Sequence, residues 1–298
     1  MNDFELSAAI GRYIAEKNPR IRYFTADIEA AKKVYSEEDL IEMRELGLIT
    51  DDFEAYYVIR EFLDLCGISE AADGSYLLEL FRFARRLDAE EFRSNPYIRT
   101  IRFPETKHGN ILLSTAEYRR GEILQYDMPD FSARTVVPRL GFFDRTVRFP
   151  TIYENKTPWM SVCPSEINSM KEPIEVAHGR VLVLGLGLGY YPFMISEKLS
   201  VDEITIVERN PRIIDLFKSY ILPQFPDKDK IRVIEDDAIR YIEAVSSGAY
   251  DFCFADIWEG VVDGAEPYQR IKSQEARLPS TEFAYWIEPQ IQAYLSLL

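Results

Sequence analysis

The stretch "VLVLGLGLGYY", residues 181–191, is an apolar run in which every second position from 185 to 189 is glycine. Its apolar start is typical of a strand buried on both faces of a parallel sheet. Glycines after such a strand let the backbone turn sharply and let a ligand approach it. The N-terminus of the following helix offers free N–H groups, which suit a carboxylate or a phosphate. The stretch therefore predicts a strand–turn–helix unit with a ligand bound at Gly185, Gly187, Gly189 and the helix start at Tyr190.

Strands and helices alternate through the residues around this stretch. The predicted strands are 180–185, 203–208, 231–236 and 250–256, and the predicted helices lie near 190–199, 211–221 and 237–246. Strands that alternate with helices favour a parallel sheet, and right-handed crossovers place all the carboxyl ends of its strands at one edge. We therefore predict an α/β fold with a Rossmann-like parallel sheet, and we expect the ligand at that edge.

The residues after Asp256 contain no obvious further strand. The segments "EPYQRIKSQEAR" (266–277) and "TEFAYWIEPQIQAYLSLL" (281–298) both read as helix. We therefore expect a sheet that either stops after four strands or is completed by strands from 97–153, and we favour the second arrangement. An uncovered edge strand would favour pairing with a second copy of the chain, so a homodimer is a further expectation.

The composition divides the chain into three predicted parts. Residues 1–96 form a helical region, 97–163 a small β-rich segment that serves as a lid, and 164–298 the Rossmann-like domain. The β-rich segment contains four short strands separated by Gly, Pro and Asn, namely "YIRTIRF", "NILLSTAEY", "GEILQYDM" and "RTVVPRL". Residues 164–177 read as one helix that is interrupted at Pro173.

Two helices are expected in the N-terminal region. Residues 54–66 have apolar side chains at helical spacing and end before Gly67, a typical C-terminal cap. Residues 75–92 read as a second helix that begins at Ser75 as N-cap and ends before Asn95. Their aromatic stripes are interpreted as core.

The charge and the rare residues exclude several function classes. The net charge of −15 repels phosphate backbones and anionic lipids, so we expect neither a nucleic-acid partner nor a membrane partner. Three cysteines without CxxC spacing and two histidines argue against a disulfide framework or a metal site. No stretch approaches ~20 uninterrupted apolar residues. The start, "MNDFELSAAIGRYIAEKNPR", lacks the pattern of a secretion signal, and we therefore expect a cytoplasmic protein.

Acidic residues follow the second and third predicted strands. Glu208 ends the second strand, where a carboxylate can accept both hydroxyls of a ribose. Asp236 and Asp237 follow the third strand at the start of a helix. One of these two carboxylates could accept a hydrogen bond from an adenine amino group while the other caps the helix. The sequence does not decide which carboxylate has which role.

The fourth predicted strand ends in "DIWEG", residues 256–260. Asp256 leaves the sheet beside the first strand, and Glu259 follows three residues later. Two carboxylates at this place could orient, deprotonate or attract an amine nucleophile. Trp258, which lies between them, either forms a wall of the pocket or packs in the core.

The acceptor pocket is expected under a roof supplied by the segments 123–131 and 155–167. The second of these leads directly into the Rossmann-like domain. Tyr126, Asp127 and Trp159 are the candidate substrate contacts in the two segments, and packing or surface roles are the alternative for each of them.

The segment 180–260 resembles the class I S-adenosylmethionine-dependent methyltransferases and is most similar to their spermidine-synthase-like branch. The resemblance rests on "VLVLGLGLG", "IVERN", "EDDA", "YDFCFAD" and "DIWEG". It implies S-adenosylmethionine or its decarboxylated form as cofactor. Tyr190 stands where a dinucleotide fingerprint has its last glycine, which argues against NAD. Glu259 and Gly260 stand where the aminopropyltransferases of this branch usually have Asp and Pro.

Three functions remain open at this point. The first is an S-adenosylmethionine-dependent methyltransferase that acts on a small molecule or a protein. The second is an aminopropyltransferase that uses decarboxylated S-adenosylmethionine, a donor that lacks the carboxylate. The third is a non-catalytic module that binds a nucleoside or a partner. In both enzymes Asp256 and Glu259 would face the acceptor, and a metal has no part.

Overall fold

The computed structural model describes residues 8–12, 14, 35–46, 53–68, 70–130 and 136–296. The chain forms two compact units, Met1–Arg93 with Glu117–Arg148, and Ser94–Ala116 with Phe149–Leu298. These units divide the chain at other points than the expected boundaries after 96 and 163, because 117–148 joins the N-terminal unit. Most of "MNDFELSAAIGRYIAEKNPR" lies outside the described residues. In the described ranges, no helix has the length and the apolar character needed to span a membrane.

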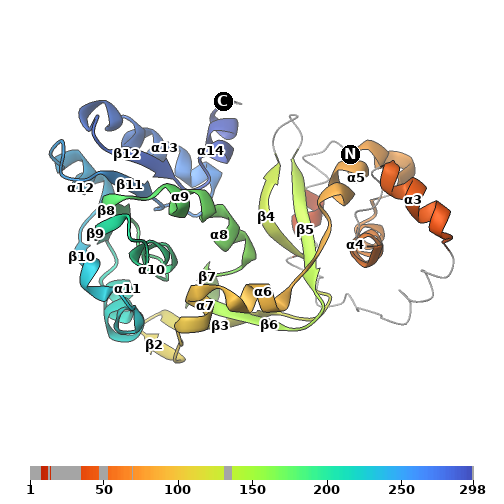
Figure 1. Cartoon of the computed structure of the whole chain (residues 1–298), viewed down its shortest axis with the longest axis horizontal. Helices are drawn as coiled ribbons and strands as arrows, with labels where there is room; N and C mark the ends of the chain where they lie inside the picture. Colours follow the sequence, from red (N-terminus) through yellow and green to blue (C-terminus); the bar gives the residue numbers. More distant parts are fainter. Residues whose placement is uncertain are drawn as a thin grey trace. The chain divides into compact units, whose positions relative to one another are not determined.

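A five-stranded parallel sheet forms the centre of the second unit (Figure 1). Its strands, in spatial order, are β10 (Ile231–Glu235), β9 (Val201–Glu208), β8 (Gly179–Leu184), β11 (Phe252–Ala255) and β12 (Glu282–Tyr285). All neighbouring strands pair in parallel. The predicted Rossmann-like α/β fold is therefore confirmed. The strand order reverses between β8 and β11, and sheets of this type bind ligands beyond the carboxyl ends of their strands at such a reversal.

The fifth strand, β12, corrects the prediction that the sheet stops after four strands. Residues 282–285, which were expected to be helical, pair with Phe252–Ala255 of β11. Phe283 and Tyr285 stack with ring centroids 6.1 Å apart, which is the two-residue spacing of a strand. The helix begins only at Glu288. Strands from 97–153 do not complete the sheet, and β12 occupies the edge on which the expected homodimer was argued. The homodimer itself stays a prediction.

Helices lie on both sides of this sheet. In Figure 1, α12 and α13 lie on one side, and α9 and α10 lie on the other. The helices of the unit that follow the glycine turn are α10 (Tyr190–Ser196), α11 (Pro211–Leu216), α12 (Ala238–Ala244), α13 (Val261–Lys272) and α14 (Glu288–Leu295). The strands β8, after its first two residues, and β11 are therefore buried on both faces, as their apolar runs predicted.

The predicted helix 164–177 is present as two short helices. They are α8 (Pro164–Ser169) and α9 (Lys171–Val176), and they meet at Met170. The interruption does not fall at Pro173, because this proline lies in the first turn of α9, where a missing N–H costs no helical hydrogen bond.

A second sheet has four strands, which precede the strands of the parallel sheet in the sequence. It consists of β2 (Thr106–His108), β3 (Ile111–Tyr118), β6 (Val147–Glu154) and β7 (Thr157–Ser161). The strand predicted at 97–103 is wrong, because Pro96–Thr100 forms the helix α7. Asn95 caps this helix by accepting from the Tyr97 amide at 3.0 Å. The buried Tyr97 hydroxyl then donates to the Leu188 carbonyl, so α7 supports the glycine turn.

The first unit combines helices with a three-stranded sheet. Its elements are α3 (Glu37–Glu45), α4 (Phe53–Leu65), α5 (Glu70–Phe83), β1 (Arg85–Leu87), α6 (Ala89–Ser94), β4 (Leu124–Asp130) and β5 (Val137–Phe143). Gly67 ends α4 with φ +76°, as predicted for a cap glycine. The single helix predicted over 75–92 is wrong. Helix α5 begins at Glu70 rather than at Ser75, and the chain then leaves it to form β1, which pairs in parallel with β5.

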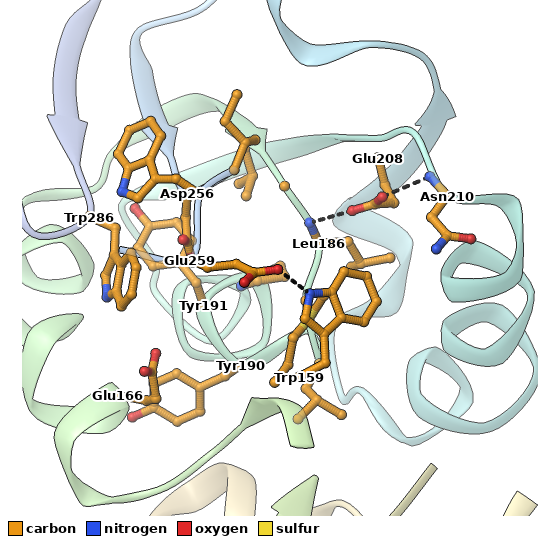
Figure 2. Close-up of a pocket in the computed structure, with 18 of the residues that line it drawn as sticks. Trp159, Glu166, Leu186, Tyr190, Tyr191, Glu208, Asn210, Asp256, Glu259 and Trp286 are labelled. Carbon is orange, nitrogen blue, oxygen red and sulfur yellow. Dashed lines mark hydrogen bonds between the residues drawn. The ribbon is translucent and has the colours of Figure 1, made fainter. Parts of the chain in front are cut away.

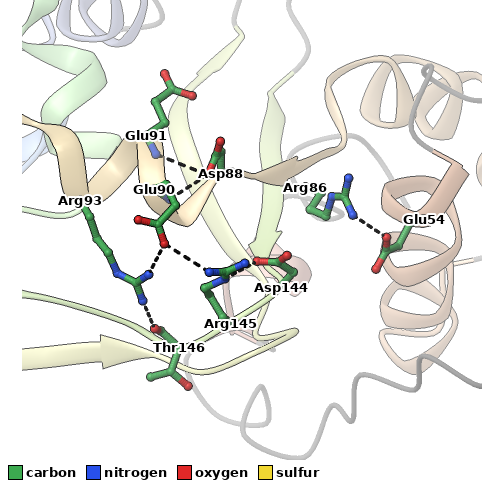
Figure 3. A network of polar contacts seen from close by, with 9 residues as sticks. All are labelled: Glu54, Arg86, Asp88, Glu90, Glu91, Arg93, Asp144, Arg145 and Thr146. Carbon is green, nitrogen blue, oxygen red and sulfur yellow. Dashed lines mark hydrogen bonds and ion pairs between the residues drawn. The ribbon is translucent and has the colours of Figure 1, made fainter.

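Ion pairs join the elements of this unit near the surface (Figure 3). Arg86 pairs with Glu54 at 2.9 Å, and so connects β1 to α4. Glu90 accepts from Arg93 at 2.7 Å and from Arg145 at 3.2 Å, and Arg93 also donates to the Thr146 carbonyl. The pairs of Glu90 with Arg93 and Arg145 are exposed, so each contributes at most about 1 kcal/mol.

Candidate functional site

A pocket of about 590 Å³ lies in the second unit at the carboxyl ends of β8, β9, β10 and β11. Figure 2 shows part of its lining. Strand β7 and helix α8 complete the wall. Nine of the predicted site residues line it: Trp159, Gly185, Gly187, Tyr190, Glu208, Asp237, Asp256, Trp258 and Glu259. The pocket lies at the edge of the sheet where the sequence predicted a ligand, and the structure brings residues from five segments of the chain together in it.

The three glycines have different roles in the turn after β8. All have positive φ, +97° at Gly185, +54° at Gly187 and +75° at Gly189. A Cβ at position 185 would lie 2.0 Å from the Asp256 carbonyl oxygen, and one at 189 would lie 2.6 Å from the Phe217 ring. These two glycines therefore make room for the protein itself, and Gly189 does not line the pocket. At Gly187 a Cβ would meet only the Met160 sulfur, at 3.6 Å, so this position leaves space beside the backbone. The expected sharp turn is present at all three glycines, and contact with a ligand stays a prediction.

Glu208 lies at the end of β9 with its carboxylate across the glycine turn. It accepts from the Leu186 amide at 3.2 Å and from the Asn210 amide at 2.8 Å (Figure 2). The two bonds use different oxygens, and each carboxylate oxygen can accept a further hydrogen bond. The side chain is thus fixed in the pocket and retains the capacity to accept from a pair of hydroxyls.

The roles of the two aspartates after β10 are now distinct. Asp237 is the N-cap of α12, accepts from the Arg240 amide at 2.9 Å and lines the pocket. Asp236 accepts from the Arg240 guanidinium at 2.7 Å, and this hydrogen bond lowers the pKa of Asp236. Asp236 is not among the lining residues, so its predicted contact with the cofactor is not supported by its position.

Two carboxyl groups in the pocket have unusual protonation. Burial raises the pKa of Asp256 well above its usual range, and the charge of Glu166 raises it further. Burial also raises the pKa of Glu166 to about 7. Sequence reasoning missed Glu166, which lies in the short helix α8 without a recognisable motif around it. A carboxyl with the pKa of Glu166 can accept and release a proton near neutral pH, which is the requirement for general acid–base chemistry.

The tryptophans of the chain converge on this pocket. The sequence contains three, and Trp159, Trp258 and Trp286 all line it. Trp159 donates its indole N–H to the exposed Glu259 at 3.1 Å (Figure 2). Trp258 is only 6% exposed and packs against Gly264, where a Cβ would lie 2.8 Å from its ring. Both alternatives for Trp258 therefore hold, since it packs and also forms part of the wall.

Tyr126 and Asp127 do not line this pocket. Both lie on β4 in the first unit. The Tyr126 hydroxyl donates to the Phe83 carbonyl at 2.8 Å, and Asp127 pairs with Arg139 at 3.2 Å. These contacts within their own unit account for both side chains, so their predicted substrate contacts have no support from the structure.

Acidic side chains dominate the lining that the structure describes. Six carboxyl groups contribute to it, from Glu154, Glu166, Glu208, Asp237, Asp256 and Glu259, against one basic residue, Arg209. A pocket with this balance attracts cations and repels anions. Its walls also carry six aromatic rings, from Trp159, Tyr190, Tyr191, Phe254, Trp258 and Trp286, which suit a cation with apolar parts.

No protein-family model matches the sequence, and no curated protein matches it. Solved structures are similar to part of it, among them the following three. A conserved hypothetical protein from Streptococcus pyogenes is 17% identical with a TM-score of 0.28, and the match covers 33% of this chain and 61% of that one. The spermidine synthase from Thermotoga maritima is 13% identical with a TM-score of 0.33, covering 46% and 53%. A spermidine synthase in complex with the transition-state analogue AdoDATO is 13% identical with a TM-score of 0.33, covering 46% and 52%.

This chain thus spans from about half to three fifths of the length of those three proteins. With TM-scores below 0.5, these likenesses carry no argument about what the chain does.

Proposed function

We propose that this chain is a transferase that takes its transferred group from an S-adenosyl sulfonium donor. One observation carries the proposal: Gly187, Glu208, Asp237 and Asp256, which end or follow four neighbouring parallel strands, all line the same pocket. The pocket thus offers an open backbone turn on one side and carboxylates on the other. An adenosine that bears a positive sulfur matches both features.

Each part of the donor has a partner in this arrangement. Glu208, which two backbone amides already hold in place, accepts from the ribose hydroxyls. Asp237 lies at the end of the next strand and accepts from the adenine amino group. The sulfonium then lies toward Asp256, where acidic side chains favour positive charge. Gly187 leaves room for the nucleoside beside the backbone.

The reaction is a displacement at the carbon attached to the sulfonium. A nucleophile forms a new bond to this carbon, the carbon–sulfur bond breaks, and its electron pair stays on sulfur as a thioether. When the nucleophile is an amine, it must lose a proton, which a carboxylate of the pocket accepts. The protein's main task is to hold the two reacting atoms ~3–3.5 Å apart and to exclude water.

Methyl transfer from S-adenosylmethionine is the first candidate reaction. The charge of the pocket lining favours a second, aminopropyl transfer from decarboxylated S-adenosylmethionine. S-adenosylmethionine carries a carboxylate, for which the described lining offers one basic side chain, Arg209, among six carboxyl groups. Its decarboxylated form lacks this anion and has one more net positive charge. The excess of acids would therefore favour the decarboxylated donor and transfer of an aminopropyl group.

Calorimetry with both donors tests these alternatives. We expect S-adenosylhomocysteine and at least one donor to bind, and the ratio of the two donor affinities to decide between methyl and aminopropyl transfer. Replacement of Glu208 by Gln should weaken nucleoside binding about tenfold or more, because hydrogen bonds from the ribose to a charged acceptor are lost. Glu203→Gln, an exposed position on the same strand, is the matched control.

The measurements have clear adverse outcomes. Full nucleoside affinity in Glu208→Gln would remove the site assignment. Donor binding without turnover of any amine, small molecule or protein acceptor would favour the third alternative, a non-catalytic nucleoside-binding module.

A further inference from the structure

Two of the six carboxyl groups in the pocket have no partner among the described residues. Four are occupied: Glu154 accepts from Asn110, Glu208 from two backbone amides, Asp237 from the Arg240 amide and Glu259 from Trp159. For Glu166 and Asp256, the described part of the chain supplies neither a side-chain hydrogen bond nor an ion pair. Both line the same pocket, and the charge of Glu166 acts on Asp256.

An unpartnered carboxyl group inside a protein is costly. Burial without a hydrogen bond or an opposite charge raises the free energy of the ionised form. The raised pKa values of both groups express this cost. A cation that enters the pocket would reduce this cost, because a nearby positive charge favours the ionised form of both carboxyl groups. The pair is therefore arranged for a positive group that the protein itself does not supply.

A hydrogen bond connects helix α8 to the residue that follows the fifth strand, β12. Trp286 directly follows β12, and its indole N–H donates to the Ser169 hydroxyl at the end of α8 at 2.9 Å. The same indole lines the pocket. The bond connects the helix that carries Glu166 to the sheet that carries Asp256, so it stabilises their common position.

The aromatic surroundings favour an organic cation. Tyr191 stacks on Phe254 with ring centroids 4.0 Å apart, and both line the pocket with Trp286. In Figure 2, Glu166, Asp256 and Trp286 lie on one side of the pocket, and Glu208 lies on the other. Aromatic faces attract ammonium groups and pack against the alkyl chain that carries them.

We infer that Glu166 is a ligand-binding residue of this pocket and that, together with Asp256, it binds an alkylammonium group. The inference rests on the proposed function for the rest of the ligand, an S-adenosyl donor with its acceptor. The ammonium group belongs either to the amino-bearing tail of the donor or to an amine acceptor, and the chemistry that binds it is the same.

The test is calorimetry on the full chain with three probes. 5′-Methylthioadenosine has the nucleoside and the thioether without a charged tail. S-adenosylhomocysteine adds a tail with an ammonium group, and 1,4-diaminobutane is an amine alone. The variants are Glu166→Gln, Glu166→Asp as the conservative change, and Glu172→Gln, which removes the same charge from an exposed position on α9. Thermal unfolding checks that each variant is folded.

We expect Glu166→Gln to weaken binding of at least one ammonium probe about tenfold or more, and to leave 5′-methylthioadenosine unchanged. Glu166→Asp should restore part of the loss, and Glu172→Gln should behave as the native chain. A loss confined to S-adenosylhomocysteine assigns the ammonium group to the donor, and a loss confined to the diamine assigns it to the acceptor; both support the inference.

Two results distinguish this inference from the proposed function. If Glu166→Gln binds both ammonium probes as the native chain does, while 5′-methylthioadenosine also binds, the inference is overturned and the proposed function stands. If the native chain binds no nucleoside, the proposed function fails, and binding of 1,4-diaminobutane alone tests the inference. Weaker diamine binding in Glu166→Gln than in the native chain supports the cation site. Equal binding in both, or no binding to the native chain, overturns it.

Discussion

Gly185 lies against the backbone of Asp256 so closely that a Cβ at position 185 would be 2.0 Å from the Asp256 carbonyl oxygen. The contact joins the ends of β8 and β11, the two strands between which the strand order reverses. It explains why a glycine directly follows strand β8: the backbone after β11 occupies the position that a Cβ would need. The site and the sheet therefore depend on the same glycine.

Substitution of the glycines should separate packing from ligand access. Gly185→Ala should lower the free energy of unfolding by about 3 kcal/mol or prevent folding, because backbone atoms must move. At Gly187 the nearest atom to a new Cβ is the Met160 sulfur at 3.6 Å, an ordinary contact. Gly187→Ala should therefore cost only about 1 kcal/mol for its positive φ, yet weaken nucleoside binding. Urea unfolding and calorimetry measure both effects, and equal costs for the two variants would contradict this interpretation.

The raised pKa of Glu166 predicts a pH-dependent stability. Its pKa is 4.5 in an ordinary environment and about 7 in the folded chain. Between these values the native state binds more protons than the unfolded state, so the free energy of unfolding falls as the pH rises through this window. The difference from this group should approach about 3 kcal/mol above pH ~7.

Glu166→Gln should remove this part of the decline. Its unfolding free energy should equal that of the native chain near pH 4.5 and exceed it at pH 8, measured by urea unfolding at both values. Asp256 contributes with the same sign, so a decline should persist in the variant. Glu172→Gln serves as the control, and an identical pH profile for Glu166→Gln and the native chain would argue against a buried, uncompensated carboxyl.

The opposite sign is expected at Asp251. Hydrogen bonds from the Arg180 side chain, two of them at 2.9 Å, and from the Arg180 amide lower the pKa of Asp251 to about 2. Its contribution to stability is present above the ordinary value of 3.8 and is lost as the pH falls toward 2. Asp251→Asn should therefore lose less stability than the native chain over this range in acid titrations followed by circular dichroism. Asp202→Asn, on the exposed start of β9, should follow the native profile.

Ligand binding should be visible in tryptophan emission, since all three tryptophans of the chain line the pocket. A nucleoside that fills the pocket changes the surroundings of each indole, and we expect a change in the intensity or position of the emission at saturation. Trp159→Phe, which removes the bond to Glu259, should retain part of the signal from Trp258 and Trp286. An unchanged emission at ligand concentrations that saturate the calorimetric signal would place the ligand elsewhere.

The local pattern of the chain was sufficient to predict four of the five strands of the parallel sheet and the acids at their ends. Hydrophobic periodicity and apolar runs identified β8, β9, β10 and β11. Right-handed crossovers between parallel strands then placed their carboxyl ends at one edge of the sheet. Glu208, Asp237 and Asp256 follow those strands directly, so their common location could be inferred. The physical reason is that the position of a residue just after a strand is fixed by the strand itself.

Short elements were predicted less well, because few residues carry their signal. The four residues of β12 read as the start of a longer helix, and β1 interrupts what reads as one helix. In both cases pairing with a neighbouring strand, which is a tertiary contact, decides the structure. Tyr126 and Asp127 were expected at the site because the segment 123–131 was predicted to roof the acceptor pocket, and the structure shows their contacts to Phe83 and Arg139 within their own unit.

By itself, the sequence determined a parallel α/β sheet and the edge of that sheet at which the pocket lies, because those features depend on periodicity and on chain direction. Only the tertiary structure decided that Gly185 makes room for Asp256, that Asp237 rather than Asp236 lines the pocket, and that Glu166 lies in it. Those outcomes depend on which segments pack against one another, and the free energy of that packing comes from contacts between residues far apart in the chain.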